Sequence, residues 1–366
     1  MTVHVCGVTF SDWVSLQFDG GWSDTFIFHI DSQACLPPFV FRPLLQRMAA
    51  RMQTKRSSAS IWVQVDAPGE WYAAEVRRSL KGLSLPFAVT QNETVPTHVE
   101  FSRPLWLGYD CSPRPPDHHE KSKLPPISPQ EMRCLQALGR MIKGDEVEIA
   151  SLAGLNVEDL LASLVKKKLV EHKVGQVIQK DKSTPVQLDP FPLWHLTIKG
   201  LSLALRSWDV PRGIEFTSRA EEHLSQIGSE HRRTSRLWLS WLKSAWPHAQ
   251  IWAGWSEVRL PEKSVIPDAL AWGKIQGYET LFWLEVGDGH KRRNKITDIT
   301  TKRLNQAWEL CERTGVRLVY AQLSTNWVHE ATCWACIDLP KEVAVVMGNK
   351  RKFGKLPTVE WGRVTK

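Results

Sequence analysis

The 366-residue chain has little that would mark a membrane-spanning, secreted or disulfide-stapled protein. No apolar run approaches the roughly 20 residues that a membrane-spanning helix needs. The opening stretch MTVHVCGVTFSDW has no basic region followed by an apolar one, so it does not predict a secretory signal. The seven cysteines form an odd set without framework spacing, which favours reduced thiols. These absences predict a cytoplasmic location and no membrane partner.

Several catalytic signatures are also missing. No GxxxxGK[ST] phosphate loop occurs, which argues against an ATPase motor, and no local Ser-His-Asp or Cys-His signature is present. Cys333 and Cys336 form a single CxxC, which supplies only half the donors of a four-ligand zinc site. The alternating apolar character of TCWACIDL predicts a buried strand there instead.

Basic residues outnumber acidic ones, and they are unevenly distributed along the chain. The chain has 47 basic and 39 acidic side chains, a formal net charge of +8, and residues 1–110 hold only 9 of the basic and 10 of the acidic ones. The basic excess therefore belongs to the rest of the chain and favours an acidic partner such as DNA. The segment YDCSPRPPDHHEKSKLPPI, rich in proline and charge, predicts a linker over residues 109–127.

Residues 1–108 predict a small α+β module. Short apolar runs, WVSLQF, TFIFHI and SIWVQV, alternate with two helical segments, PLLQRMAARMQ and EWYAAEVRRSL. No chemical motif occurs in this part, and partner binding or self-association is the role that we expect of it.

Residues 128–212 predict a winged helix-turn-helix. Ser128, Pro129 and Glu131 open a helix as cap, first position and third position. Two further helices meet at the turn GLN, the second over 157–168, and a strand, a basic loop, another strand and a helix follow. In the DNA-binding version of this fold the second helix enters the major groove and the wing touches the backbone. The predicted DNA contacts are then Lys166, Lys167 and Lys168 on the helix and Lys173, Lys180 and Lys182 on the wing.

The start of that second helix is acidic. Glu158 and Asp159 suit the positive end of the helix dipole but would meet phosphates badly. A protein-binding or dimerising role for this domain therefore stays open beside DNA binding.

Residues 213–366 predict a third domain with a basic C-terminal tail at GNKRKFGK. A long helix over 218–246 precedes three strands, a helix over about 295–313 and a fourth strand, the order α-β-β-β-α-β. Asp268 stands at the start of the second strand and Glu285 at the end of the third. These two strands form a hairpin through Gly277, so both carboxylates are expected at one end of the sheet, where such a pair can hold a hard divalent cation.

Pro267-Asp268 and the Glu285 of FWLEVGDGHK, on this α-β-β-β-α-β frame, resemble the PD-(D/E)xK nuclease superfamily. The resemblance covers residues 217–325 and implies a restriction-endonuclease-like core. With the upstream winged helix and the segment HLTIKG, the chain also resembles the replication-relaxation proteins of mobile elements, which pair a winged helix with a nuclease-like domain.

The resemblance implies a site that holds Mg²⁺ or Mn²⁺. Asp268 and Glu285 match the metal ligands, and Glu257 on the preceding strand is a further candidate ligand. The superfamily's lysine, two residues after the glutamate, is replaced here by Gly287, and Lys291 or Lys295 is expected to supply the missing charge. His231, Arg292 and Arg293 are candidate DNA contacts beside this site.

The sequence thus predicts a multidomain α+β and α/β protein that binds DNA and acts in mobile-element replication, transfer or control. Two alternatives stay open. The chain can be an active metal-dependent DNA endonuclease, in which the bound metal lowers the pKa of the attacking water, or an assembly adaptor with a silent nuclease fold that binds protein partners or itself.

Overall fold

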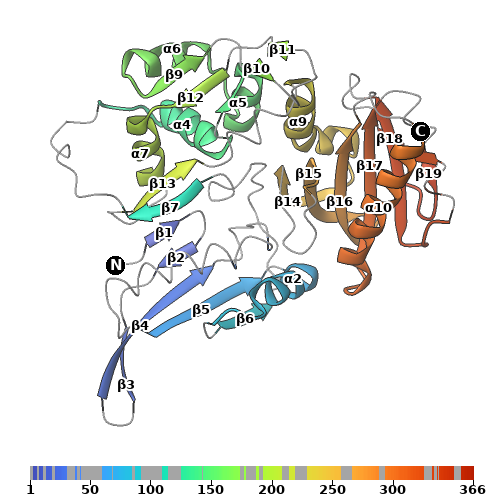
Figure 1. The fold of residues 1–366 in the computed structure, drawn as a ribbon, viewed down its shortest axis with the longest axis horizontal. Coiled ribbons are helices and arrows are strands. Elements are labelled where there is room, and N and C mark those ends of the chain that lie inside the picture. The colour runs from blue at the N-terminus through green and yellow to red at the C-terminus, as the bar shows by residue number, and fades with distance from the viewer. Residues whose placement is uncertain are drawn as a thin grey trace. The chain divides into compact units, whose positions relative to one another are not determined.

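The computed structural model describes the chain in segments that belong to two compact units (Figure 1). One unit is Met1–Thr94 with Arg103–Ser229, and the other is Val95–Ser102 with Glu230–Lys366. The described residues are 3–5, 8–10, 14–18, 21–30, 38, 42, 60–67, 69–84, 87–91, 109–113, 125–141, 143–173, 177–178, 187–188, 193–207, 214–218, 229–256, 266–287, 293–324, 332–333, 336, 338–349 and 356–366. They form a mixed α/β protein in which, within these segments, seven helices occur.

The N-terminal part of the first unit is a six-stranded sheet with one described helix. Its path runs β1-β2-β4-β5-β6, with β3 paired to β4, and the neighbours β4, β5 and β6 are parallel. Helix α2 joins β5 to β6 and buries Tyr72, Val76 and Leu80, which recur every fourth residue on one face. This part thus mixes helix and strand as predicted, but its sheet is partly parallel and α2 is a crossover between parallel strands. The predicted helix PLLQRMAARMQ lies outside the described residues. The elements are β1 (Val3–Val5), β2 (Val8–Phe10), β3 (Val14–Phe18), β4 (Gly21–Ile30), β5 (Ser60–Ala67), α2 (Glu70–Leu80) and β6 (Phe87–Gln91).

The first residues of the predicted linker form a strand instead. β7 (Tyr109–Pro113) pairs antiparallel with β13 (Ile214–Ser218), a segment that the sequence assigned to the C-terminal domain. Backbone pairing needs no particular side chains, so the composition of residues 109–127 did not reveal it. By their contacts, Arg103–Ser229 group with the first compact unit and Glu230–Lys366 with the second.

The central helical part combines four helices with a three-stranded antiparallel sheet of order β8-β12-β9. A separate two-stranded hairpin, β10 with β11, lies between β9 and β12 in the chain. The elements are α4 (Pro129–Met141), β8 (Lys143–Gly144), α5 (Glu146–Ala153), α6 (Glu158–Lys166), β9 (Val170–Lys173), β10 (Val177–Ile178), β11 (Gln187–Leu188), β12 (Leu193–Leu196) and α7 (Ile198–Ser207).

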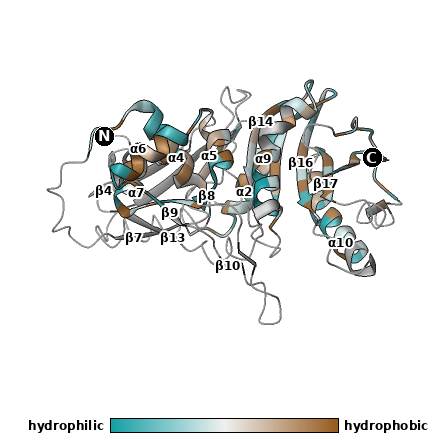
Figure 2. Cartoon of the chain, turned by 90° about the horizontal axis from the view of Figure 1, so that it is seen from above, coloured by the Kyte–Doolittle hydropathy of each residue, from teal (hydrophilic) through white to brown (hydrophobic). Residues whose placement is uncertain are grey.

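Local sequence explains where these helices begin and end. The Ser128 hydroxyl accepts from the Glu131 N–H and the Glu131 carboxylate from the Ser128 N–H, the predicted reciprocal cap of α4. Gly154 ends α5 in the left-handed region with φ 65°. Hydrophobic and hydrophilic residues alternate along α4 in Figure 2, as a helix with one buried face requires. That face contributes Leu135 and Leu138 to the core of this part.

The second unit is built on a six-stranded sheet of order β14-β15-β16-β17-β18-β19. Its first three strands are antiparallel and the others parallel. Gln276 and Gly277 both have positive φ, 52° and 84°, and make the predicted hairpin turn between β15 and β16. The elements are α9 (Ser229–Ala245), β14 (Gln250–Ser256), β15 (Ala269–Ile275), β16 (Tyr278–Val286), α10 (Arg293–Glu312), β17 (Arg317–Ser324), β18 (Val343–Asn349) and β19 (Val364–Thr365).

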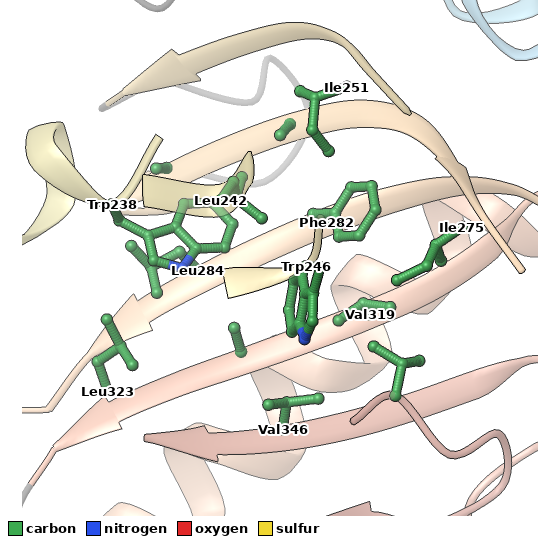
Figure 3. Packing of buried hydrophobic residues seen from close by; sticks show 14 of the residues in the cluster. Trp238, Leu242, Trp246, Ile251, Ile275, Phe282, Leu284, Val319, Leu323 and Val346 are labelled. Atoms are coloured by element: carbon green, nitrogen blue, oxygen red, sulfur yellow. The ribbon is translucent and has the colours of Figure 1, made fainter. Parts of the chain in front are cut away.

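Alternation along the strands divides this sheet into two faces. Trp238 and Leu242 of α9 and Trp246, which directly follows that helix, pack on one face, against Phe282 and Leu284 of β16 (Figure 3). Trp283 and Glu285 alternate with these core residues along β16, so their side chains lie on the other face of the sheet. Helix α10, which joins β16 to β17, packs against β17.

Three predictions about this unit need correction. The predicted helix over 218–246 does not include Ser218, which ends β13; its described part is α9, and residues 219–228 lie outside the described segments. Thr332 and Cys333 are helical and the Cys336 N–H donates to the Cys333 carbonyl, so the described residues of TCWACIDL form a turn and not the predicted strand. Local turn hydrogen bonds here prevail over the alternating apolar pattern.

The basic segment GNKRKFGK is no terminal tail. Residues after it return to the sheet, where β19 pairs parallel with β18 and Val359 joins the core. The Arg317 guanidinium also lies over the Tyr278 ring, 3.2 Å from its centroid, and near Trp361. Burial of Val359 and this stacking hold the last residues, which charge composition alone did not indicate. Cys134, Cys311, Cys333 and Cys336 are free thiols. Among the described helices none is long and apolar enough to cross a membrane.

Candidate functional site

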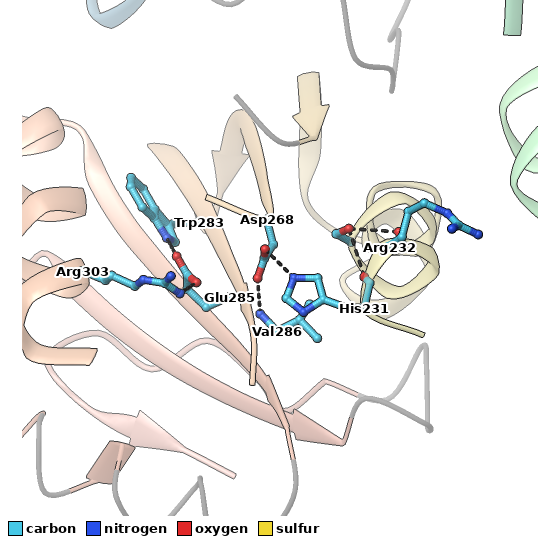
Figure 4. A network of polar contacts seen from close by, with 8 residues as sticks. His231, Arg232, Asp268, Trp283, Glu285, Val286 and Arg303 are labelled. Carbon is cyan, nitrogen blue, oxygen red and sulfur yellow. Dashed lines mark hydrogen bonds and ion pairs between the residues drawn. The ribbon is translucent and has the colours of Figure 1, made fainter. Parts of the chain in front are cut away.

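Asp268 and Glu285 lie at one edge of the C-terminal sheet, where β15 begins and β16 ends. The Asp268 N–H donates to the Leu284 carbonyl at 3.2 Å, which places Asp268 directly beside the end of β16. The hairpin geometry expected from the sequence thus brings the two carboxylates onto neighbouring strands. We call Asp268, Glu285, His231, Arg303 and Trp283 the edge network (Figure 4).

Both oxygens of the Asp268 carboxylate have protein partners. The Val286 N–H donates to Oδ2 at 2.6 Å, and His231 Nε2 lies 2.7 Å from Oδ1. An ionised carboxylate only accepts, so the Nε2 carries the proton in this contact. The two side chains are 16% and 18% exposed, which leaves this half of the network in reach of solvent.

Glu285 is buried, and its carboxylate accepts from two side chains, those of Trp283 and Arg303. Trp283 Nε1 donates to Oε1 at 2.9 Å, because residues two apart on a strand share a face. The Arg303 guanidinium forms an ion pair with Oε2. Glu285 is 1% exposed, and a buried carboxylate needs such a partner to stay ionised.

Further polar side chains line the same face of the sheet. Tyr320 and Gln322 of β17 stand in register with Trp283 and Glu285 and are buried. Burial raises the pKa of the Tyr320 phenol above its usual range, although the charge of Arg303 acts in the opposite direction. Tyr320 is therefore a neutral member of this face at physiological pH.

The contacts of the two carboxylates do not suit a bound Mg²⁺ or Mn²⁺. These cations take about six oxygen ligands, whereas the oxygens of Asp268 and Glu285 accept from His231, Val286, Trp283 and Arg303. Among the residues that the structure describes, no three His, Cys, Asp or Glu gather in a metal-binding group. No reaction step through a metal is therefore derived from the edge network.

The structure does not describe the side chains of the other residues that were predicted for this site. Glu257, Lys291 and Arg292 lie outside the described residues, and Lys295 and Arg293 lie in the first turn of α10, with their side chains outside the described set. His231, predicted to contact DNA, contacts Asp268.

The predicted DNA-binding residues of the central part have different environments. Lys166 and Lys168 are exposed at the end of α6. Lys167 is engaged, because its Nζ contacts the Glu131 carboxylate at 2.6 and 2.8 Å and donates to the Pro126 carbonyl at 3.0 Å. Three predicted wing residues lie at positions whose side chains fall outside the described set: Lys173, Lys180 and Lys182.

The contact with Glu131 gives Lys167 a structural role. Burial alone would raise the pKa of Glu131, but hydrogen bonds from Lys167, the Ser128 N–H and Ser163, together with the charge of Lys167, lower it to about 2. Glu131 thereby ties α4 to α6 through Ser163 at 2.8 Å and Lys167.

Sequence reasoning missed Arg303, which supplies the cation at Glu285. Its position carried a signal, since Thr300, Arg303, Ala307 and Leu310 follow helical spacing and three of the four are buried. A charged residue in phase with a buried helix face predicts a buried partner, and Glu285 is that partner.

No family model matches this chain, and neither a curated protein nor a solved structure shows significant similarity to it.

Proposed function

We propose that the protein binds DNA through a central domain of the winged-helix type and carries a nuclease-like C-terminal domain. The observation that supports this most is the order α4-β8-α5-α6-β9-β12 with sheet order β8-β12-β9. A paired hairpin, β10 with β11, stands where a wing belongs. In DNA-binding proteins of this type the helix at the position of α6 enters the major groove.

Charge favours a particular part of this surface. The chain has a net charge of +8, and the exposed Lys166 and Lys168 lie at the carboxyl end of α6, whereas Glu158 and Asp159 are exposed at its start. We therefore propose that phosphate contacts come from the carboxyl end of α6 and from the basic segment between β10 and β11. The resemblance to proteins of mobile elements suggests a role in their replication, transfer or control.

Nuclease-like architecture is proposed for the second unit from the order α9-β14-β15-β16-α10-β17, with Asp268 and Glu285 at one sheet edge. Since both carboxylates are held by protein donors, we propose binding rather than cleavage as the function. Plasmid and linear DNA incubated with Mg²⁺, Mn²⁺ or EDTA should stay intact but retarded. Metal-dependent cleavage that Asp268→Ala abolishes would establish the endonuclease instead.

Gel retardation against salt concentration tests the binding. Affinity should fall steeply with salt, because each lysine that contacts a phosphate releases counterions. Replacing Lys166 by Ala and Lys168 by Asn should lower the salt slope by about 2. Asn is chosen because Lys168 has a positive φ of 58°.

A matched control removes the same charge from other exposed positions of the central part, with Arg133→Ala and Lys199→Ala. It should leave the slope close to that of the parent protein. Absent or salt-insensitive binding by the parent protein would contradict the proposal.

A second candidate function is an assembly adaptor, and the exposed face of α6 favours it. Ala162 and the 40% exposed Val165 lie on that face beside Glu158 and Asp159, a mixture more typical of a protein contact than of a groove-binding helix. Oligomerisation or partner capture lost in Val165→Glu, with no DNA retardation, would support this function.

A further inference from the structure

We infer that Arg303 occupies the place of a divalent cation in the edge network and keeps its two carboxylates in a closed, metal-independent state. The contacts that support this inference all lie within the C-terminal unit. It does not depend on whether the protein binds DNA.

The Arg303 guanidinium lies at the buried carboxylate of Glu285. Glu285 is 1% exposed and its partners are Trp283 and Arg303. Arg303 lies on the inner face of α10, between Thr300 and Ala307, so the helix holds its charge against the sheet. A metal ion that entered would have to displace this charge and would leave the guanidinium beside a dication.

Asp268 itself is less closed than Glu285. The Val286 N–H donates to its Oδ2 from the backbone of β16, and His231 contacts its Oδ1. A carboxylate offers about four lone-pair sites, so these two contacts leave acceptor sites on Asp268. The charge of Arg303 at Glu285, and not a lack of oxygen sites, is therefore what keeps a cation out of the parent protein.

Removal of Arg303 should reveal what it replaces. Without the guanidinium, the buried Glu285 carboxylate has lost its compensating charge, and such a carboxylate either takes up a proton or recruits another cation. The same pair of carboxylates that excludes Mn²⁺ in the parent protein then becomes a latent cation site.

The experiment measures thermal unfolding of the full chain in EDTA and in Mg²⁺ or Mn²⁺, without DNA. The parent protein should show no metal-dependent shift. Arg303→Met and Arg303→Gln should unfold at lower temperature in EDTA and gain about 3 °C at a metal concentration roughly tenfold above the dissociation constant. Asp268→Asn added to either variant should abolish that gain. Lys302→Ala, which removes the neighbouring exposed charge, should behave as the parent protein does.

Two outcomes would overturn the inference. One is a metal-dependent rise in the parent protein that Asp268→Asn removes, a result that needs no Arg303 variant to fold. The other is a folded Arg303→Met or Arg303→Gln protein that does not respond to either metal. DNA retardation is a separate readout, so its loss or retention bears on the proposed function alone.

Discussion

Each of the two units buries a glutamate that pairs with a basic side chain. The two carboxylates differ in how many neutral hydrogen-bond donors they have besides that cation. Glu131 accepts from the Ser128 N–H and the Ser163 hydroxyl as well as from Lys167. Glu285 accepts from one neutral donor, Trp283, and from Arg303. We therefore expect that a buried carboxylate with more neutral hydrogen-bond donors loses less stability when its cationic partner is removed.

The largest effect should come from removing the two cations. Arg303→Met leaves Glu285 with one donor and should cost about 3 to 5 kcal/mol of unfolding free energy near neutral pH. Lys167→Met leaves Glu131 with two neutral donors and should cost about half as much. Urea unfolding, with hydrogen exchange to locate the loss in α4 or β16, measures both. Equal losses would break the comparison.

Acid should weaken the central part next. The folded pKa of Glu131, about 2, lies below its ordinary value of 4.5. The stabilisation is therefore fully present above about pH 4.5 and is lost as the pH falls towards 2, a change of about 3 kcal/mol. Glu131→Gln should remove this part of the pH dependence of urea unfolding. A variant whose stability falls with acid as steeply as that of the parent protein would contradict the assignment.

Removing a neutral donor from each pair should have a smaller effect. Trp283→Phe keeps the ring in the sheet face but removes the Nε1–H that donates to Glu285, and Ser163→Ala removes the hydroxyl that donates to Glu131. Each change should cost about 1 kcal/mol by urea unfolding. A loss in Trp283→Phe well above that in Ser163→Ala would sharpen the difference between the pairs.

The smallest effect should follow His231→Ala. Its contact with Asp268 is partly exposed, and Asp268 keeps the Val286 N–H, so we expect a loss of about 0.5 kcal/mol. Thermal unfolding measures it. A loss as large as that of Arg303→Met would show that Asp268 relies on His231 as strongly as Glu285 relies on Arg303.

Several features could be predicted because they depend on neighbours in the chain. The cap of α4 by Ser128 and Glu131, helix α2 and the hairpin turn at Gly277 each follow from residues a few positions apart. The convergence of Asp268 and Glu285 followed from that hairpin, since its two strands must run side by side.

The sequence by itself determined the helix caps, the hairpin turn and the placing of two carboxylates on adjacent strands, because short-range backbone geometry sets all three. Only the tertiary structure decided the pairing of β7 with β13 and the choice of Arg303 as the cation at Glu285. Strand pairing uses backbone groups that every residue carries, and α10 meets the sheet through packing across the fold, so spacing along the chain names neither partner.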